Sequence, residues 1–264
     1  MTFDTATRGT VLATAATDPL DAGHAFFLGG VGGDDPEFAE LARRLRPHLR
    51  LVPVDYPDAG ARGAVLSSMA ATAAVVTADI ERLQPRGGIA LVGYSFGGSL
   101  ALEVANQLTR AGRTVDLLCP LDAPFRMDEL RGLFEKLRLA TAPRQAMKKV
   151  VEAAALSEVT LRLVTNAASP DVVGGARANP VRRALLTHLR TKALAGWRPE
   201  GCDAPGLLVS TGVLGAENRA RWLSLCPGLA CVEIGGEHER LLQGASLDRV
   251  VEALAGAVRR RAAR

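Results

Sequence analysis

Short, continuous hydrophobic runs alternate along most of the chain with longer segments in which hydrophobic residues recur at helical spacing. The runs predict strands at residues 25–30, 49–57, 88–95, 114–124, 204–212 and 230–236. The helical patterns fall at residues 38–49, 67–84, 97–112 and 246–264. Strands that are hydrophobic throughout, rather than at every second position, are buried on both faces. We therefore expect an α/β fold, with a mostly parallel sheet and helices on both of its faces.

One segment, residues 125–200, breaks this alternation because it contains helical patterns and no clear strand. Its helical patterns lie at residues 129–140, 145–167 and 179–194. The segment predicts a helical insertion into a core formed by residues 1–124 and 201–264. An insertion of this size is often a lid over a site. We expect a lid here, and the alternative is a helical subdomain that only adds stability.

Composition narrows the class of protein more than charge does. A chain of 264 residues with 48% hydrophobic and 23% charged residues is typical of a globular protein and excludes a disordered chain or a coiled coil. The net charge of +4 does not argue for nucleic acid, although it suits a moderately acidic partner. The sequence has no apolar run of about 20 residues to span a membrane, and residues 1–23 lack the pattern of a signal peptide. We expect a cytoplasmic protein whose four cysteines are reduced, because none lies in a CxxC pair or at zinc-ligand spacing from a histidine.

The motif that carries chemistry is Gly93-Tyr94-Ser95-Phe96-Gly97, a GxSxG pentapeptide. It falls between a predicted buried strand and a predicted helix, which is the structural context of a nucleophile elbow. In such a turn the serine backbone is strained and Oγ stands above the carboxyl edge of the sheet, while the glycines avoid collisions with the neighbouring strand and helix. The pattern predicts Ser95 as a nucleophile, with an ordinary glycine-rich turn as the alternative. The chain has no GxxxxGK[ST] or GxGxxG motif that would indicate a nucleotide site.

A serine nucleophile needs a base, and His238 is the histidine whose position fits that role. It lies between the last predicted strand and the last predicted helix, which places it at the same sheet edge as Ser95. Its place also fits the expected chain order of a catalytic serine, then an acid, then a histidine. We expect His24, His48 and His188 to be surface or packing histidines.

Two acidic residues follow predicted strands and are candidates for orienting His238. Asp122 follows the fourth strand, and Glu217 follows the fifth. Each position also fits a solvated loop acid, so the pattern alone leaves both candidates open.

The oxyanion hole is expected from two backbone N–H groups. One belongs to Phe96, which directly follows the nucleophile. The other belongs to Val31 in the glycine-rich loop at residues 29–33, where the missing side chains allow the backbone to approach a bound carbonyl. The alternative for this loop is a flexible turn.

With these motifs the chain resembles the α/β-hydrolase thioesterases that act on acyl carrier proteins in polyketide, nonribosomal-peptide and fatty-acid synthesis. The resemblance covers about residues 22–124 and 204–245. It rests on the glycine-rich loop and helix at residues 25–45, on the helix, strand and elbow at residues 67–108, and on GGEHERLL at residues 235–242. One departure is Gly29, which stands where the family usually has proline.

The resemblance also bears on the acid. Chain-terminating members carry the aspartate after the strand that follows the elbow helix, which matches Asp122, 27 residues beyond Ser95. Standalone editing members tend to carry the acid one strand later, where this chain has Glu217. The resemblance therefore favours Asp122 and keeps Glu217 as the alternative.

The function that the resemblance implies is that of a serine thioesterase. Such an enzyme releases a polyketide or peptidyl chain from the phosphopantetheine thioester of an acyl or peptidyl carrier protein through an acyl-enzyme, by hydrolysis or by cyclisation. It needs no metal and no organic cofactor, since acyl transfer of this kind uses only the triad and the oxyanion hole. The alternatives are a free esterase or lipase on small esters and a non-catalytic carrier-protein binder. We expect a standalone protein, with a domain of a longer synthase as the other possibility.

The charge distribution points to a surface for that partner. Residues 125–200 contain 14 Lys and Arg but only 7 Asp and Glu, a net charge of +7, whereas the whole chain carries +4. A basic surface would steer an acidic carrier protein toward the site. The pairs Lys148–Lys149 and Arg182–Arg183 are the first candidates for docking, and the alternative is an ordinary solvated helical face.

Overall fold

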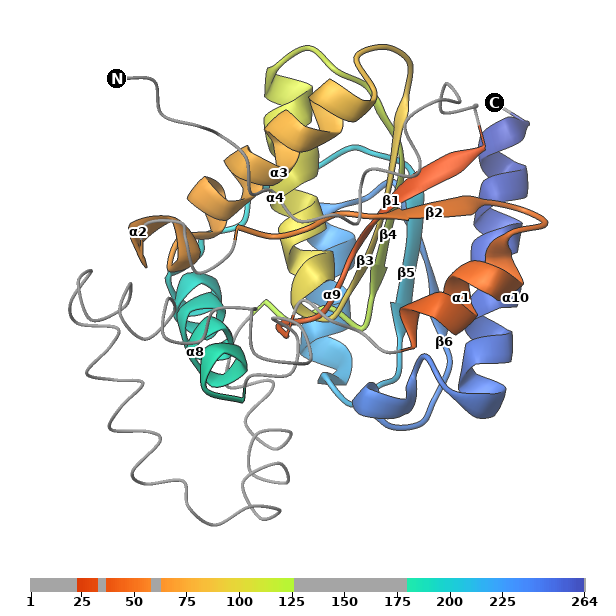
Figure 1. The fold of residues 1–264 in the computed structure, drawn as a ribbon. Helices are drawn as coiled ribbons and strands as arrows, with labels where there is room; N and C mark the ends of the chain where they lie inside the picture. The colour runs from red at the N-terminus through yellow and green to blue at the C-terminus, as the bar shows by residue number, and fades with distance from the viewer. Residues whose placement is uncertain (1–22, 33–36, 58–62, 126–179, 264) are drawn as a thin grey trace, which may run out of the picture.

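The structure, a computed structural model, describes residues 23–32, 37–57, 63–125 and 180–263. Over these residues, six strands form one sheet in the order β2-β1-β3-β4-β5-β6, and every neighbouring pair is parallel (Figure 1). The strands are β1 (His24–Leu28), β2 (Arg50–Pro53), β3 (Ile89–Tyr94), β4 (Val115–Leu121), β5 (Gly206–Ser210) and β6 (Leu229–Glu233). Because all of them run the same way, their carboxyl ends meet at one edge. The sheet confirms the predicted α/β class.

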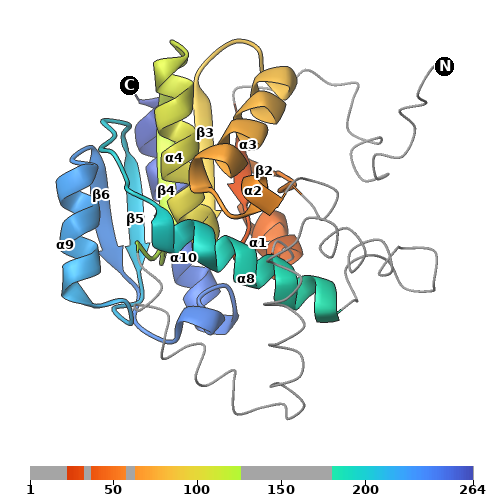
Figure 2. The ribbon, with the colours of Figure 1, turned by 90° about the vertical axis from the view of Figure 1, so that its left-hand side faces the viewer.

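Helices cover both faces of this sheet, as the hydrophobic strands require (Figures 1 and 2). One face packs against α3 (Met69–Leu83), α4 (Phe96–Arg110) and α9 (Gly215–Leu225), and the short α2 (Gly63–Leu66) precedes α3. The other face packs against α1 (Phe38–Leu45) and α10 (Gly244–Ala262). Two hydrophobic clusters, one on each face, therefore hold the sheet in place.

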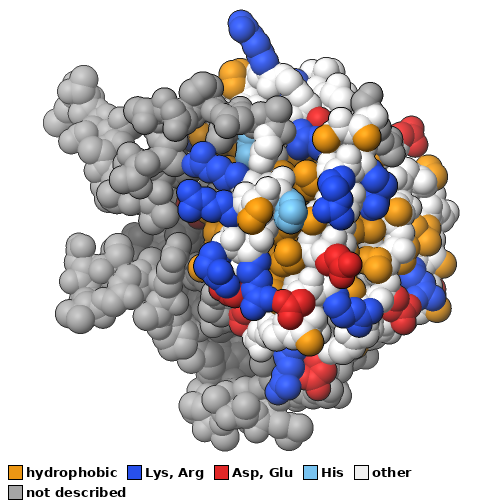
Figure 3. All heavy atoms as spheres, turned by 90° about the vertical axis from the view of Figure 1, so that its right-hand side faces the viewer, with side chains coloured by type: hydrophobic (Ala, Val, Ile, Leu, Met, Phe, Trp, Pro, Cys, Tyr) orange, Lys and Arg blue, Asp and Glu red, His pale blue; other side chains and the backbone are white. Residues whose placement is uncertain are grey.

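The outer surface of α1 and α10 carries charges of both signs, which lie among hydrophobic side chains in Figure 3. Arg44 of α1 forms ion pairs with Glu40 on its own helix and with Asp248 on α10. The hydrogen bonds from Arg43 and Arg44 lower the pKa of Glu40 to about 2, so this carboxylate stays ionised at neutral pH. Of these pairs, Arg44–Asp248 links α1 to α10.

Helix α8 (Pro180–Gly196) is the described part of the predicted insertion and matches the helical pattern expected at residues 179–194. It lies beside α2 and α3 (Figure 2). Leu194 and Trp197 at its carboxyl end belong to the same hydrophobic cluster as α3 and α4. The indole N–H of Trp197 donates a hydrogen bond of 3.0 Å to Glu103 Oε2 on α4. This end of the segment is thus fixed on the core, while the helices expected at residues 129–140 and 145–167 lie outside the described residues.

Two differences from the sequence-based expectations have simple causes. The hydrophobic pattern gave no helix between the last two strands, yet α9 lies there. Within α9 only Asn218 and Trp222 are buried, so the hydrophobic spacing that identifies the other helices is missing. The helix expected at residues 38–49 ends at Leu45, two residues before Pro47, whose ring does not fit a helix interior.

Candidate active site

Ser95 occupies a strained turn between β3 and α4. Its backbone dihedral angles, φ of 54° and ψ of −124°, lie in a region that residues other than glycine rarely adopt. The turn is possible because of the glycines on either side. A Cβ on Gly93 would come within 2.3 Å of the carbonyl oxygen of Gly97, and one on Gly97 within 2.1 Å of the carbonyl oxygen of Leu28. The structure therefore has the strand-turn-helix geometry that the GxSxG motif predicts, and it places Ser95 at the amino end of α4, where the helix dipole favours negative charge.

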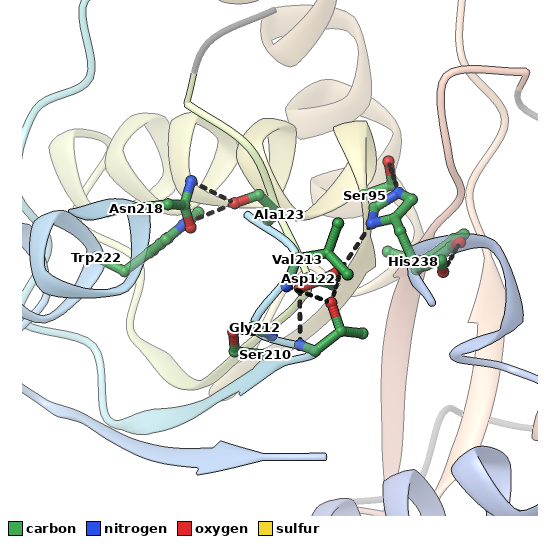
Figure 4. A network of polar contacts seen from close by, with 11 residues as sticks. Ser95, Asp122, Ala123, Ser210, Gly212, Val213, Asn218, Trp222 and His238 are labelled. Atoms are coloured by element: carbon green, nitrogen blue, oxygen red, sulfur yellow. Dashed lines mark hydrogen bonds and ion pairs between the residues drawn. The ribbon is translucent and has the colours of Figure 1, made fainter. Parts of the chain in front are cut away.

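His238 lies directly beside this serine (Figure 4). It begins a short 3₁₀ helix, His238–Arg240, in the connection between β6 and α10. Its Nε2 is 2.9 Å from Ser95 Oγ, and its Nδ1 is 2.7 Å from Asp122 Oδ2. An ionised carboxylate only accepts hydrogen bonds, so Nδ1 carries the proton and Nε2 accepts from the serine hydroxyl. All three side chains are at least 95% buried. The arrangement is that of a Ser-His-Asp triad.

Asp122, and not Glu217, is the carboxylate that contacts the histidine. It directly follows β4 with a φ of 45°, which aims its side chain across the edge of the sheet toward β5. There it accepts hydrogen bonds from the backbone N–H of Thr211 at 2.9 Å and from the Thr211 hydroxyl at 2.8 Å. Glu217 lies in the first turn of α9 with an exposed side chain. Of the two acids that the sequence pattern leaves open, the structure brings only Asp122 to His238.

The loop that carries Asp122 is braced from α9 (Figure 4). The carbonyl oxygen of Ala123 accepts hydrogen bonds from the Trp222 indole at 2.8 Å and from the Asn218 side-chain amide at 3.3 Å. These buried donors hold the residue that follows Asp122, and so help to maintain its unusual backbone conformation.

Tyr94 supports the histidine from the side of the nucleophile turn. Its ring stacks on the imidazole of His238 with the centroids 5.3 Å apart and the planes at 22°. Its hydroxyl donates a hydrogen bond of 2.7 Å to the carbonyl oxygen of His238. The sequence pattern predicts a role for neither Tyr94 nor Thr211. Tyr94 sits inside the motif, where its position could have signalled a role, whereas Thr211 belongs to no motif.

The two backbone groups assigned to the oxyanion hole lie on neighbouring elements. Phe96 is the first residue of α4, so its N–H has no acceptor within the helix. The segment leaving β1 passes directly over this turn, because a Cβ on Gly97 would come within 2.3 Å of the Gly29 carbonyl oxygen. Val31, two residues further along, packs against the same hydrophobic cluster as Phe96.

The other predicted residues lie elsewhere or outside the description. Lys148 and Lys149 fall in the part of the chain that is not described, and Arg182 and Arg183 are in α8 with side chains that are likewise not described. His24 bonds to Gln84 at 2.9 Å, away from the triad. Within the described ranges, no cluster of three or more His, Cys, Asp or Glu could hold a metal ion. In the same ranges, no helix is both long enough and apolar enough to cross a membrane.

Comparison with known proteins places this geometry in a family. A model of the thioesterase domain matches residues 24–257, nearly the whole chain. The chain belongs to the thioesterase domain family. It is therefore an enzyme of the serine-hydrolase type.

Relatives of this thioesterase domain include segments of very large synthases. It is 39% identical to an N-(5-amino-5-carboxypentanoyl)-L-cysteinyl-D-valine synthase of Amycolatopsis lactamdurans over 98 residues. The match covers 37% of this chain and 3% of that protein. It is 34% identical to a non-reducing polyketide synthase of Cladonia metacorallifera over 88 residues. This match covers 29% of this chain and 4% of that protein. The matches thus span a few per cent of the length of these curated relatives.

A solved structure agrees with the fold over most of both chains. The NocB thioesterase domain from the nocardicin cluster has a TM-score of 0.62 and 24% sequence identity, covering 89% of this thioesterase domain and 93% of that chain. This likeness confirms the α/β-hydrolase fold.

Proposed function

We propose that this thioesterase domain releases an acyl chain, polyketide or peptidyl, from the phosphopantetheine thioester of a carrier protein through an acyl-enzyme on Ser95. The observation that carries the proposal is the continuous hydrogen-bonded chain from Ser95 Oγ through His238 to Asp122, with separations of 2.9 and 2.7 Å. Each member is buried, so the geometry is held by packing and by hydrogen bonds rather than by chance contact in solvent.

Acylation follows from the protonation states that these contacts favour. Ser95 Oγ attacks the thioester carbonyl carbon while His238 Nε2 takes the hydroxyl proton, and the new imidazolium is stabilised by Asp122. The carbonyl oxygen becomes an oxyanion, which the N–H groups of Phe96 and Val31 bind. As the intermediate collapses, the C–S bond breaks and the phosphopantetheine sulfur leaves with the proton from His238.

Release of the chain reverses these roles. His238 removes a proton from a nucleophile, which attacks the Ser95 ester and passes through a second oxyanion. If the nucleophile is water, the product is a free acid, and if it is a hydroxyl or amine of the chain itself, the product is a macrocycle. The proton on His238 then returns to Ser95 Oγ. No step requires a metal or an organic cofactor of the protein.

The charge distribution along the chain and the related sequences both support a carrier protein as the partner. Two of the related sequences are those of synthases. Residues 125–200 carry a net charge of +7, although the whole chain carries only +4. An acidic carrier protein would be steered to this segment, and the attraction would weaken as salt is added.

The experiment that tests the proposal compares one acyl group on two thioesters, a carrier protein and a small pantetheine mimic. We expect a higher kcat/KM for the carrier-bound substrate, and we expect salt to reduce this advantage. The double charge reversal of Lys148 and Lys149 to Glu should raise KM for the carrier-bound substrate and spare the mimic. Equal kcat/KM for both thioesters, or a preference for simple esters, would favour a free esterase. A carrier that binds but is not turned over would favour a non-catalytic binder.

A further inference from the structure

The loop that supplies the Val31 N–H is built largely of glycine. Its sequence after β1 is Gly29-Gly30-Val31-Gly32, and none of these residues belongs to a helix or strand. Glycine backbones have access to more conformations than any other residue, so such a loop does not hold a peptide N–H in one direction by itself. An oxyanion hole works through donors that are already oriented before the reaction. Something else must therefore fix this loop.

The first contact that fixes the loop comes from Tyr56, which follows β2. Its hydroxyl donates a hydrogen bond to the carbonyl oxygen of Gly29. The edge of its ring meets the ring of Phe96, with centroids 6.0 Å apart and planes at 72°. Tyr56 thus contacts the loop that carries Val31 through the Gly29 carbonyl, and it also packs against Phe96, the other residue of the predicted oxyanion hole.

The second contact comes from Arg190 in α8. Its Nη1 donates a hydrogen bond of 2.9 Å to the carbonyl oxygen of Val31. Its guanidinium lies over the Tyr56 ring, 4.9 Å from the centroid. Arg190 is only 4% exposed, although arginine is almost never buried unless it is paired. Its contacts with Val31 and Tyr56 therefore lie in the protein interior.

The two contacts bracket one peptide unit. Gly29 O belongs to the peptide before the Gly30–Val31 peptide, and Val31 O belongs to the peptide after it. Each peptide is planar, so fixing the two outer units restricts the rotation of the one between them. That central unit carries the N–H of Val31.

We propose that Arg190 and Tyr56 are positioning residues that orient the Val31 N–H for the oxyanion, Arg190 through the Val31 carbonyl and Tyr56 through the Gly29 carbonyl. The inference rests on the proposed function, because it concerns the same acyl-transfer site. It also assigns α8 a part in catalysis, since this helix reaches the oxyanion loop through Arg190. Neither residue touches the reacting atoms, so their loss weakens binding of the transition state more than binding of the substrate.

The test uses three variants and a matched control. Tyr56→Phe removes only the hydroxyl and keeps the ring against Arg190 and Phe96. Arg190→Met removes the donor and the charge, and Arg190→Lys restores a donor and a charge without the planar guanidinium. Arg113→Met is the control, since Arg113 also donates to backbone carbonyls of a glycine-containing turn, those of Gln84 and Gly87, which precede β3.

Each variant is assayed for kcat and KM with a small acyl thioester, for melting temperature, and for affinity to an alkylboronic acid. The boronic acid bonds to Ser95 Oγ, and the tetrahedral adduct places an oxygen in the oxyanion hole. We expect Tyr56→Phe and Arg190→Met to lower kcat by about 10- to 100-fold with KM within about threefold, somewhat less than the loss of an oxyanion donor itself. Affinity for the boronic acid should fall by the same factor, Arg190→Lys should recover part of it, and Arg113→Met should behave as wild type.

The inference is overturned if kcat and boronic acid affinity of both Tyr56→Phe and Arg190→Met stay within threefold of wild type. It is also overturned if the decreases in kcat and boronic acid affinity merely match a decrease in the amount of folded protein. The same holds if Arg113→Met shows equal decreases. Should Arg190→Met not fold, Tyr56→Phe alone decides the question. A wild-type enzyme that neither forms an acyl-enzyme on Ser95 nor binds the boronic acid contradicts the proposed function itself, and the inference with it.

Discussion

The carboxylate of Asp122 accepts hydrogen bonds from three donors, and these bonds explain how it orients His238. Thr211 contributes its N–H and its hydroxyl, and His238 contributes Nδ1–H. The two Thr211 bonds hold the carboxylate so that Oδ2 faces the imidazole. A buried carboxylate with these partners holds the histidine in the tautomer whose Nε2 can accept the serine proton.

At the scale of the residue, we expect Asp122→Asn to lower kcat/KM on the order of 10⁴-fold, because an amide in that place stabilises the wrong imidazole tautomer. Glu217→Gln makes the same chemical change at the other candidate acid and should alter kcat/KM by less than about threefold, since its side chain is exposed. Steady-state kinetics on one acyl thioester checks both variants. The opposite ranking would move the orienting acid to Glu217.

At the scale of the element, the decisive feature is the close approach of β1, β3 and α4 at the nucleophile turn. Gly97 lies against the end of β1, where Cβ would meet the carbonyl oxygens of Leu28 and Gly29 at 2.1 and 2.3 Å. Both contacts are to backbone, which cannot move aside as a flexible side chain can. The position of α4 over the sheet therefore depends on the absence of one methyl group.

We accordingly expect Gly97→Ala to cost at least about 2 kcal/mol in unfolding free energy, in the range of overpacked cores. For a chain of this size this lowers the melting temperature by about 4–8 °C. Gly196→Ala in α8 is the matched control, because a Cβ there meets nothing within 4 Å, and it should leave the melting temperature unchanged or raise it slightly. Thermal unfolding followed by circular dichroism compares the two. Equal melting temperatures for both variants would show that the turn tolerates a side chain.

Some of these elements and site residues can be predicted from the sequence, and others cannot. The strands, the elbow at Ser95 and the placement of His238 follow from hydrophobic runs and one motif, since these are local signals. The choice between Asp122 and Glu217 depended on a resemblance, because both acids follow strands and only the path of the loop after β4 separates them. Thr211 could not be found at all, since its role arises from the side-by-side pairing of β4 and β5, which is a feature of the sheet and not of its own segment.

At the scale of the whole molecule, the four cysteines provide a test of which side chain does the chemistry. Cys119, Cys202 and Cys226 are buried, and burial raises the pKa of Cys119 and of Cys226 to about 12. Burial raises the pKa of Cys202 as well, so all three buried thiols carry too little thiolate at pH 8 for rapid reaction. Cys231 is the exposed thiol.

Iodoacetamide at pH 8 should therefore modify Cys231 first and reach the other three thiols only when the protein is unfolded. Activity should stay within about twofold during the first modification, because Ser95 Oγ and both ring nitrogens of His238 have hydrogen-bond partners other than these thiols. Mass spectrometry and an activity assay on the same sample follow both quantities. Inactivation in proportion to thiol loss would point to cysteine chemistry and away from the triad.

The most direct measurement on the central claim is peptide mapping after rapid acid quench of the enzyme with an acyl thioester. We predict that the acyl mass appears on the peptide that contains Ser95 and is absent from Ser95→Ala. Ser224→Ala, the same change at an exposed serine of α9, should acylate as wild type. An adduct that persists in Ser95→Ala, or that maps to another residue, would contradict the account.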